Sequence, residues 1–465
     1  MRCEARPETL CAAKLVMPFR PENTADDTPA PCAPRVWAVL CYRHGDNAQI
    51  LAVAEGLGWP FEVKRLDYRW FGYAVDVWRH EMLLGVDVKG SSPLQPPWPD
   101  LVISASMRNE PVCRWIRRQS GGRTRYIHLG RTWGRLETFD LVVTSPEFRL
   151  RRLPNIHHNA LALTRVSEPK LAEAATTWAP PLAHLPRPWT AVLMGGYGGP
   201  YALDAGKARR LGEAANAMAA ERGGSLLVTT SARTRRALAR ALRGAITVPA
   251  HVFEWRPDSP DNPFYGYLAL ADSFIVTADS ASMLAEACAT RRPVYMFDPG
   301  PPGFSPLAPS PDPRADPFSW RTLFDFDCWK AFIYRQMLKV PPRRMTRDIR
   351  LVHRYLIETG RAVWLSQPFP AATPPPLDLM TPTVERIRAL LGQQAAAEAR
   401  CCEGQRPFSV GARHKRSSEM TESRSVSGGQ AREADARPVM RADSGGDRIA
   451  FPMPCGVPAP PGRRA

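Results

Sequence analysis

A short segment between residues 277 and 288 carries side chains well suited to chemistry on a phosphorylated ligand. Ser280 and Ser282 supply hydroxyl groups at the start of a predicted helix, and Glu286 follows six residues after Ser280. At 1.5 Å per residue, this carboxylate lies roughly 9 Å farther along the helix. The hydroxyls can donate to phosphate oxygens at the helix N-terminus, and the carboxylate can accept from ribose hydroxyls. The alternative is an N-cap serine followed by an ordinary helix glutamate.

The loop Gly195-Gly-Tyr-Gly-Gly199 is a second candidate anion site. It follows a predicted strand and precedes a predicted helix, where backbone N–H groups and the positive helix end can hold phosphate. It lacks both the dinucleotide-binding pattern G-x-G-x-x-G and the P-loop pattern. A glycine turn needed only for its positive φ explains the loop equally well.

The elements that position these motifs alternate between apolar strands and helical patterns. Continuous apolar strands separated by helices predict parallel sheets that are covered on both faces. The strands predicted in the first region are 35–41, 61–66, 99–105, 125–129 and 139–144, with helices at 47–57 and 111–118. The strands predicted in the second region are 189–194, 225–230, 251–255, 274–277 and 293–297, with helices at 204–222, 234–242, 263–270 and 280–289.

Composition divides the chain into four zones. A Pro- and Ala-rich leader covers 1–34, and two periodic regions cover 35–185 and 188–392 on either side of a Pro-rich joint at 179–188. Residues 393–465 have few large apolar side chains, so we expect them to be disordered. The prediction is an α/β protein with two tandem doubly wound, Rossmann-like domains, disordered extensions at both ends, and a cleft between the carboxyl ends of the two sheets.

Overall composition excludes several protein classes. With 465 residues, 44% hydrophobic residues and ten scattered cysteines without a C-x-x-C pair, the chain is neither fibrous nor a small disulfide scaffold. No apolar run approaches the roughly 18 to 20 residues needed to cross a bilayer. Acidic residues in the leader argue against an organellar transit peptide. We therefore expect a cytoplasmic protein with reduced thiols.

The positive charge of the chain, +17 at pH 7, is unevenly distributed. Between Arg108 and Arg165 there are twelve arginines and four acidic residues. This excess fits a nucleic acid, an anionic lipid layer or a phosphate-bearing substrate. Solvated surface arginines that reflect a compositional bias explain it as well.

The motifs resemble two related groups of proteins. The segment from Ser280 to Glu286 is similar to the sugar-nucleotide site in the C-terminal domain of GT-B glycosyltransferases. The chain resembles more closely the mitochondrial fission (elongated-mitochondria) family of plants and its bacterial relatives. The matching segments are 44–49, 54–58, 99–103, 195–196, 229–234, 261–265 and 277–288. Where that family tends to show Pro-Glu-His-Asp, this chain has Pro146-Glu-Phe-Arg149, so the role of that His or Asp is absent.

The resemblance implies a GT-B-like fold and roles for individual residues. It implies that Gly195, Gly196, Ser280 and Ser282 contact the diphosphate of a nucleoside-diphosphate sugar, which is the donor substrate, and that no cofactor is needed. Arg233 would offset the charge that grows on the leaving group, and Glu286 would bind the ribose. Backbone dipoles and an arginine can do this electrostatic work, so no metal site is expected.

A glycosyl transfer also requires a base that accepts the proton of the acceptor hydroxyl. His44 is the candidate base and Asp46 the residue that orients it, because both follow the first predicted strand. The alternative is that Asp46 and Asn47 cap the following helix. Glu110 is a reserve candidate for the base.

Other conspicuous residues have structural explanations. Asp325-Phe-Asp327 imitates a D-x-D metal motif but lies beyond the last strand, and we interpret it as accidental. His157-His158 is interpreted as a loop pair rather than a zinc site. An aromatic cluster, interpreted as a cover over the first sheet, consists of Tyr68, Trp70, Phe71 and Tyr73.

The hypothesis from the sequence is a nucleotide-sugar-dependent glycosyltransferase. Its acceptor is unidentified, membrane-associated or anionic, with a lipid-linked acceptor as one form, and the expected location is cytoplasmic and peripheral at the inner membrane. No nucleic-acid partner is expected. The alternatives are a sugar-nucleotide epimerase, which shares this architecture, and a non-catalytic, membrane-associated interaction protein that keeps a degenerate nucleotide fold.

Overall fold

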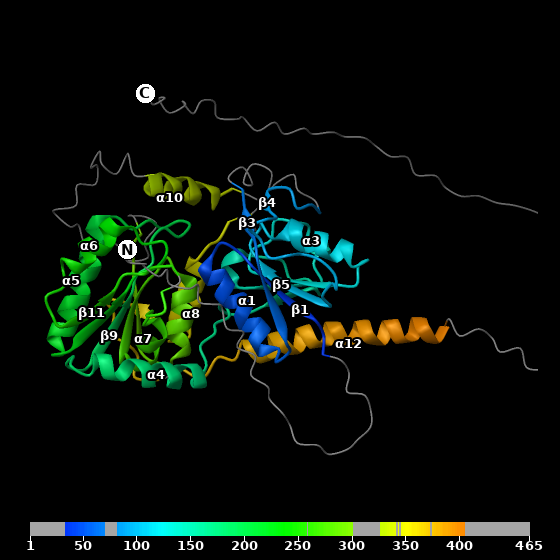
Figure 1. The fold of residues 1–465 in the computed structure, drawn as a ribbon. Coiled ribbons are helices and arrows are strands. Elements are labelled where there is room, and N and C mark those ends of the chain that lie inside the picture. The colour runs from blue at the N-terminus through cyan, green and yellow to red at the C-terminus, as the bar shows by residue number, and fades with distance from the viewer. Residues whose placement is uncertain are drawn as a thin grey trace, which may run out of the picture. The chain divides into compact units, whose positions relative to one another are not determined.

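Two parallel β-sheets organise the chain (Figure 1). The computed structural model describes residues 33–69, 81–257, 259–300, 326–340, 343, 346–372 and 374–404. Across the first sheet the strands are, in order, β2 (Phe61–Arg65), β1 (Val36–Leu40), β5 (Leu101–Ala105), β6 (Arg125–Leu129), β7 (Leu141–Thr144) and β8 (Ile156–His158). All neighbouring strands pair in parallel. Most of these strands are buried along their length, which explains their continuous apolar sequences.

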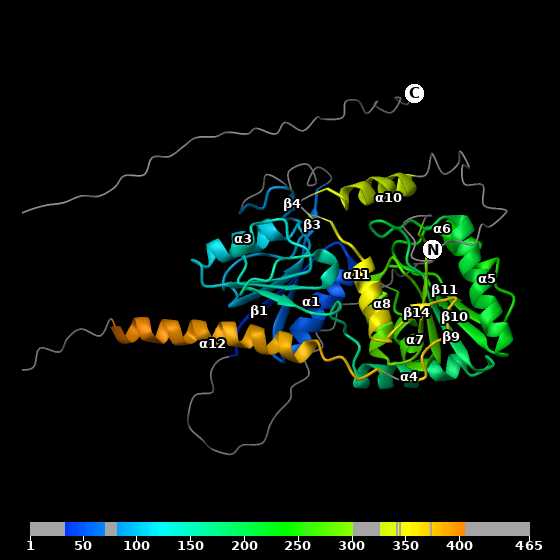
Figure 2. The same ribbon diagram turned by 180° about the vertical axis from the view of Figure 1, so that it is seen from behind.

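Helices cover both faces of the first sheet (Figure 2). Helix α1 (His44–Gly56) packs on one face with α12 (Met380–Gly404), whose Val384 and Ile387 belong to the same apolar core as Leu101 and Ile127. Helix α3 (Glu110–Gln119) packs on the other face. A small antiparallel pair, β3 (Asp67–Tyr68) with β4 (Val86–Asp87), lies outside this sheet.

The second sheet repeats the plan with greater regularity. Its strands are, in order, β11 (Ala250–Phe253), β10 (Ser225–Thr229), β9 (Trp189–Leu193), β12 (Ser273–Thr277), β13 (Val294–Phe297) and β14 (Val363–Trp364). Helices α5 (Ala205–Glu221) and α6 (Arg236–Arg243) share a core on one face. The core on the other face takes residues from α4 (Glu168–Leu182), α7 (Phe264–Leu270), α8 (Ala281–Ala289) and α11 (Arg350–Glu358).

Each sheet has a point where the strand order reverses. In the first sheet β1 lies between β2 and β5, and in the second β9 lies between β10 and β12. The loops that leave the carboxyl ends of such strands diverge to opposite faces and open a crevice. The loop before α1 and the glycine loop after β9 therefore occupy equivalent positions in the two halves. This architecture confirms the predicted fold class of two tandem, GT-B-like doubly wound domains.

Two helices, α4 and α12, differ from the pattern that the sequence indicates. Helix α4 continues through Pro180 and Pro181, which the sequence analysis treats as part of a joint. Helix α12 packs on the first sheet, although its residues up to 392 are assigned to the second region by sequence. It also continues to Gly404, past the expected start of the tail at Gln393. None of the helices in the described residues is both long enough and apolar enough to cross a membrane.

Candidate functional site

Helix α8 begins at the carboxyl end of β12 without a side-chain cap. Ser280 is its N-cap residue, and no side-chain hydrogen bond from Ser280 satisfies the first turn. The first backbone N–H groups of a helix have no partner within the helix and attract anions. Ser280 is buried and Ser282 is half-buried. The N-terminus of α8 thus keeps the donors that an anion-binding helix needs.

Glu286 is buried on the same helix without a protein partner. Its side chain is 7% exposed, and no described residue makes a hydrogen bond or ion pair with it. Burial in these apolar surroundings raises the pKa of the Glu286 carboxyl to about 8. Tyr265 of α7 lies nearby, and its pKa is raised to about 12 by burial and then by the charge of Glu286. A buried carboxyl group with no partner is uncommon in folded proteins and calls for an explanation.

The glycine loop after β9 uses its backbone donors within the protein. Gly195 donates its N–H to Thr277 Oγ1 at 2.8 Å, and Gly196 donates to Asp279 Oδ2 at 3.1 Å. Gly198 donates to the carbonyl oxygen of Tyr201. The Gly195 and Gly196 groups expected to hold a diphosphate therefore already have acceptors.

Asp279, which follows β12, binds the glycine loop through its side chain, although its sequence position alone did not indicate this role. Its side chain is fully buried, and Arg233 Nη1 lies 2.8 Å from its Oδ2. Arg233 also donates to the carbonyl oxygen of Tyr197. The other oxygen, Asp279 Oδ1, has no hydrogen-bond partner among the described residues. The Asp279 carboxylate is thus the anion that the loop and Arg233 hold in this structure.

Glycine is required in the loop by this packing. A Cβ on Gly195 would overlap the Asp279 carboxylate, and a Cβ on Gly196 would overlap the backbone of residue 233. A Cβ on Gly198 would lie 2.7 Å from Arg233 Nη1. The loop, Arg233 and Asp279 follow the three adjacent strands β9, β10 and β12, so they form one unit at the carboxyl edge of the sheet. An acidic residue placed just after a central strand is the signal that could have identified Asp279.

The N-terminus of α1 meets the N-terminus of α8. A Cβ on Gly45 would lie 3.1 Å from Ser282 Oγ, so the two helices approach closely at this point. His44, the first residue of α1, is exposed and packs edge-to-face on Trp255 with ring centroids 5.1 Å apart. His44 is therefore the chain neighbour of Gly45, the residue that approaches the Ser282 hydroxyl.

Asn47 and Asp46 do not cap α1. Asn47 Oδ1 accepts the N–H of Cys41, and its Nδ2 donates to the carbonyl oxygen of the same residue, both at 2.8 Å. The N-cap position of α1 is Arg43, which makes no side-chain capping bond. Asp46 lies near the Cys41 thiol, whose pKa is raised to about 12 by burial and then by Asp46. Asn47 thus fastens the loop that precedes His44, and the Asp46 carboxylate lies at the Cys41 thiol, with 4.0 Å between Sγ and Oδ2, while the His44 ring packs on Trp255.

Glu110, the reserve candidate for the base, holds a neighbouring loop in place through hydrogen bonds to its backbone. It accepts hydrogen bonds from the backbone N–H groups of Trp133 and Gly134, each at 2.7 Å. Burial raises the pKa of Glu110 to about 7, although these two bonds lower it. The carboxylate therefore ties the start of α3 to the loop after β6.

The segment that replaces Pro-Glu-His-Asp joins the first sheet to a later part of the chain. Arg149 adopts a left-handed conformation with φ of 53° and donates to the carbonyl oxygen of Arg343 at 2.9 Å. The carbonyl oxygen of Glu147 accepts the N–H of Asp348 at 2.7 Å. In this chain the segment thus fixes the strand end to the residues that precede α11.

Comparison with known proteins places these motifs in a family. The family described as mitochondrial fission ELM1 matches residues 44–305, which is more than half of the chain. The chain belongs to this family. The match to the ELM1 family includes α1, the glycine loop, Arg233 and α8, whereas α10 (Phe326–Met337), α11 and α12 lie beyond it.

A curated relative is the mitochondrial fission protein ELM1 of Arabidopsis thaliana. It is 28% identical over 242 residues, which are 46% of this chain and 56% of the relative. The chain thus spans little more than half the length of this ELM1 protein.

Three solved structures are similar to the chain at low identity. MurG of Acinetobacter baumannii is 13% identical, with 78% of this chain and 94% of that chain covered and a TM-score of 0.33. The glycosyltransferase SnogD of Streptomyces nogalater is 14% identical, with 70% and 99% covered and a TM-score of 0.32. Arabidopsis thaliana UGT89C1 in complex with UDP is 10% identical, with 70% and 99% covered and a TM-score of 0.32. These likenesses are too remote to assign an activity.

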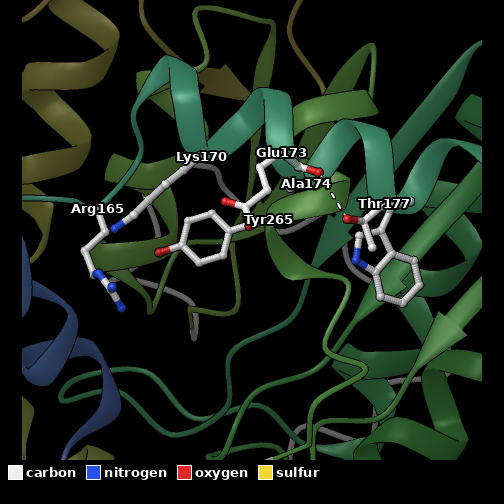
Figure 3. Close-up of a pocket in the computed structure, with 7 residues that line it drawn as sticks. Arg165, Lys170, Glu173, Ala174, Thr177 and Tyr265 are labelled. Atoms are coloured by element: carbon white, nitrogen blue, oxygen red, sulfur yellow. Dashed lines mark hydrogen bonds between the residues drawn. The ribbon is translucent and has the colours of Figure 1, made fainter. Parts of the chain in front are cut away.

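A separate cavity of about 270 Å³ opens near Tyr265 (Figure 3). Its lining includes Arg165 and Lys170, whose charged ends lie on the same side as the Tyr265 hydroxyl. Both cations bind Glu55 of α1: Arg165 by its guanidinium, and Lys170 Nζ at 2.6 Å from Glu55 Oε2. These ion pairs lower the pKa of Glu55 against the opposing effect of its burial. The cavity therefore lies beside a cluster of two cations on one carboxylate, which joins α1 to the start of α4.

The remaining residues singled out by sequence occupy ordinary positions. Asp327 lies in α10 and pairs with Arg235 and Lys330, each at 3.4 Å, whereas Asp325, Trp70, Phe71 and Tyr73 lie outside the described residues. His157 and His158 belong to strand β8, so the expectation of a loop pair was wrong. The Tyr68 hydroxyl donates to the carbonyl oxygen of Arg108 at 3.0 Å. The Tyr68 ring lies under the guanidinium of the same arginine.

Proposed function

We propose that this protein is a glycosyltransferase that binds a nucleoside-diphosphate sugar along α8. The observation that carries the proposal is the Glu286 carboxyl, which is buried with no hydrogen-bond or ion-pair partner among the described residues, on a helix whose N-cap Ser280 makes no side-chain capping bond. A buried carboxyl needs hydrogen bonds to offset its desolvation. The hydroxyls of a ribose would supply them, while Ser280, Ser282 and the helix N-terminus would hold the diphosphate.

The diphosphate competes with Asp279 for the same donors. Arg233 and the Gly196 N–H now bind the Asp279 carboxylate. The Arg233 side chain is 37% exposed, so it can turn toward a ligand without first being uncovered. Donor binding in this proposal exchanges one anionic partner of Arg233 for another, and Arg233 then offsets the charge on the leaving diphosphate without a metal ion.

His44 is the proposed base and Asp46 the proposed positioning residue. His44 is exposed and adjoins the Gly45 contact with Ser282, so it borders the N-terminus of α8. Imidazole is well suited to accept a hydroxyl proton near neutral pH. Attack by the acceptor oxygen on the sugar forms the new glycosidic bond, breaks the bond to the diphosphate and passes the acceptor proton to His44.

The proposed acceptor is anionic or lipid-linked and is held by the first half. Arginines follow its central strands at the carboxyl edge: Arg43 after β1, Arg108 after β5 and Arg131 after β6. These arginines, of which Arg43 is exposed and Arg108 is buried, favour an acceptor that carries phosphate. We propose that the protein acts in the cytoplasm, peripherally at a membrane.

Two observations favour a second candidate, a non-catalytic interaction protein. The donors that a diphosphate would use are occupied by Asp279, and Arg149 takes part in chain packing where the relatives tend to have His-Asp. In this alternative, the Asp279 unit is a permanent structural replacement for the ligand.

Nucleotide binding separates the two candidates. Isothermal titration of the purified full chain with UDP-, GDP-, ADP- and CMP-sugars should show saturable binding of at least one donor. Glu286→Ala should weaken that binding by about tenfold, because two hydrogen bonds to the ribose hydroxyls, each contributing about 0.5 to 1.5 kcal/mol, would be lost. The matched control is Glu221→Gln at the exposed end of α5, which should bind as the wild type does. If none of these donors shows saturable binding, the glycosyltransferase proposal is removed and the second candidate is supported.

A further inference from the structure

Helix α10 exposes its large apolar side chains and buries smaller ones, the reverse of an ordinary surface helix. Its inner side buries small and medium residues such as Ala331, together with Leu338 just beyond the helix end. Five large apolar side chains, each between 47% and 61% exposed, are Trp329, Phe332, Ile333, Met337 and Val340. The spacing of three and four residues places Trp329, Phe332, Ile333 and Met337 on one face of α10, and Val340 lies just beyond the end of the helix. A surface helix of a globular protein normally exposes its polar face, so this exposed apolar stripe indicates a partner.

The inner side of α10 is fixed to the glycine loop. The Tyr334 ring packs against Gly199, at 3.3 Å from a Cβ placed there. Arg335 Nη1 donates to the carbonyl oxygen of Pro200 at 2.8 Å, and Asp327 pairs with Arg235 of the loop before α6. These contacts orient the helix, so its apolar face points away from the second sheet.

Basic residues occur along the segment that carries this apolar face, and two of them, Lys339 and Arg343, are exposed next to it in the chain. From 326 to 347 the sequence contains six lysines and arginines and one acidic residue, Asp327. Asp327 is paired with Lys330 and Arg235, while Lys339 and Arg343 are exposed. An apolar stripe that contains Trp and Phe and has basic flanks is the pattern of helices that lie in the plane of a membrane surface. Anionic lipid headgroups would complement the charge.

We propose that α10 docks the protein on a membrane surface that carries anionic lipids. The apolar side chains enter the boundary between headgroups and acyl chains, and the lysines and arginines contact lipid phosphates. Because α10 covers the glycine loop, docking brings this loop close to the lipid surface. The proposal stands apart from glycosyl transfer, since it depends on α10 and not on Glu286.

A protein partner or a second copy of the chain could also cover an apolar helix face. The charge around α10 favours the membrane, because the exposed basic residues would repel the same face of a second copy. The different occupants predict different results in the experiment below.

Vesicle sedimentation tests the proposal with the full chain. Vesicles of phosphatidylcholine mixed with phosphatidylglycerol should bind the wild type, and vesicles of phosphatidylcholine alone should bind it less. The double variant Phe332→Gln/Ile333→Gln should bind the mixed vesicles at least about tenfold more weakly, because two half-exposed apolar side chains no longer enter the lipid. The control is Ile357→Gln/Leu377→Gln, which alters apolar residues exposed elsewhere and should bind like the wild type.

Several results would overturn the proposal. Failure of the wild type to bind mixed vesicles at low salt would do so, as would equal binding of the Phe332→Gln/Ile333→Gln variant. Sedimentation velocity without lipid supplies another test: self-association that this variant abolishes would assign the face to a second copy. A large loss of thermal stability in this variant, absent from the control, would show that the face is covered within the chain.

Discussion

Replacement of Glu286 by glutamine should change how the stability of the protein depends on pH. The pKa of Glu286 in the folded protein is about 8, against an ordinary value of 4.5. Between these pH values the unfolded chain is ionised at this position while the folded chain stays protonated. The folded state then binds more protons, so the free energy of unfolding falls as pH rises. Glutamine has no proton to lose, and Glu286→Gln removes this contribution.

The size of the effect follows from the pKa shift. One pKa unit corresponds to about 1.4 kcal/mol, so the wild type should lose about 3 to 4 kcal/mol between pH 5 and pH 8 through this group. Glu286 is 7% exposed, so solvent screens the effect little. The variant should therefore be close in stability to the wild type at pH 5 and clearly more stable at pH 8.

Urea unfolding of both proteins at several pH values measures this difference. Glu110, whose pKa is about 7, titrates in the same direction but is present in both proteins and cancels. Glu221→Gln is the control, because an exposed glutamate should leave the pH dependence unchanged. Parallel curves for wild type and Glu286→Gln would refute the reasoning, since they would mean that Glu286 is ionised in the folded protein at neutral pH.

Three further predictions concern the glycine loop and the base. Gly195→Ala should lower the free energy of unfolding by about 2 kcal/mol or more in urea titrations, because its Cβ would overlap the buried Asp279 carboxylate; unchanged stability would contradict the described packing. Asp279→Asn should raise the affinity for inorganic diphosphate in calorimetry, because Arg233 loses its anionic partner; weaker binding would show that Asp279 assists the anion. His44→Asn should leave donor affinity unchanged and slow release of nucleoside diphosphate from the donor by about a hundredfold or more; equal rates would exclude His44 as the base.

The sheets were predictable because most of their strands are buried along their length. The apolar run 125–129 coincides with β6, and 189–194 exceeds β9 by one residue. Helix α8 begins one residue after the predicted start, because Ser280 is its N-cap. Patterns of this kind depend on local burial, which sequence periodicity reports directly.

Contacts between distant segments were less accessible from the sequence. The pairing of Arg233 with Asp279 requires that the ends of β9, β10 and β12 lie side by side, and strand order is set by tertiary packing. The Pro180-Pro181 pair suggested a break, yet both prolines fall in the last turn of α4, where the helix is ending. The return of Val384 and Ile387 to the first sheet carries no local signal at all.

Some features of the candidate site were predictable from the sequence, and others are visible only in the folded protein. The sequence pointed to α8, and the structure shows why: its N-terminus has no capping side chain, and Glu286 is buried without a partner. The sequence also pointed to the glycine loop, but the occupation of its N–H groups by Thr277 and Asp279 is a feature of the folded state alone.

The central claim is that α8 holds the donor of a glycosyl transfer. Its most direct test is a crystal of the full chain soaked with a nucleoside diphosphate. We predict ribose hydroxyls within hydrogen-bond distance of Glu286, the diphosphate at Ser280 and Ser282, and Arg233 turned from Asp279 to a phosphate oxygen. A soaked crystal in which Arg233 remains on Asp279 and Glu286 remains without a ligand partner would contradict the claim.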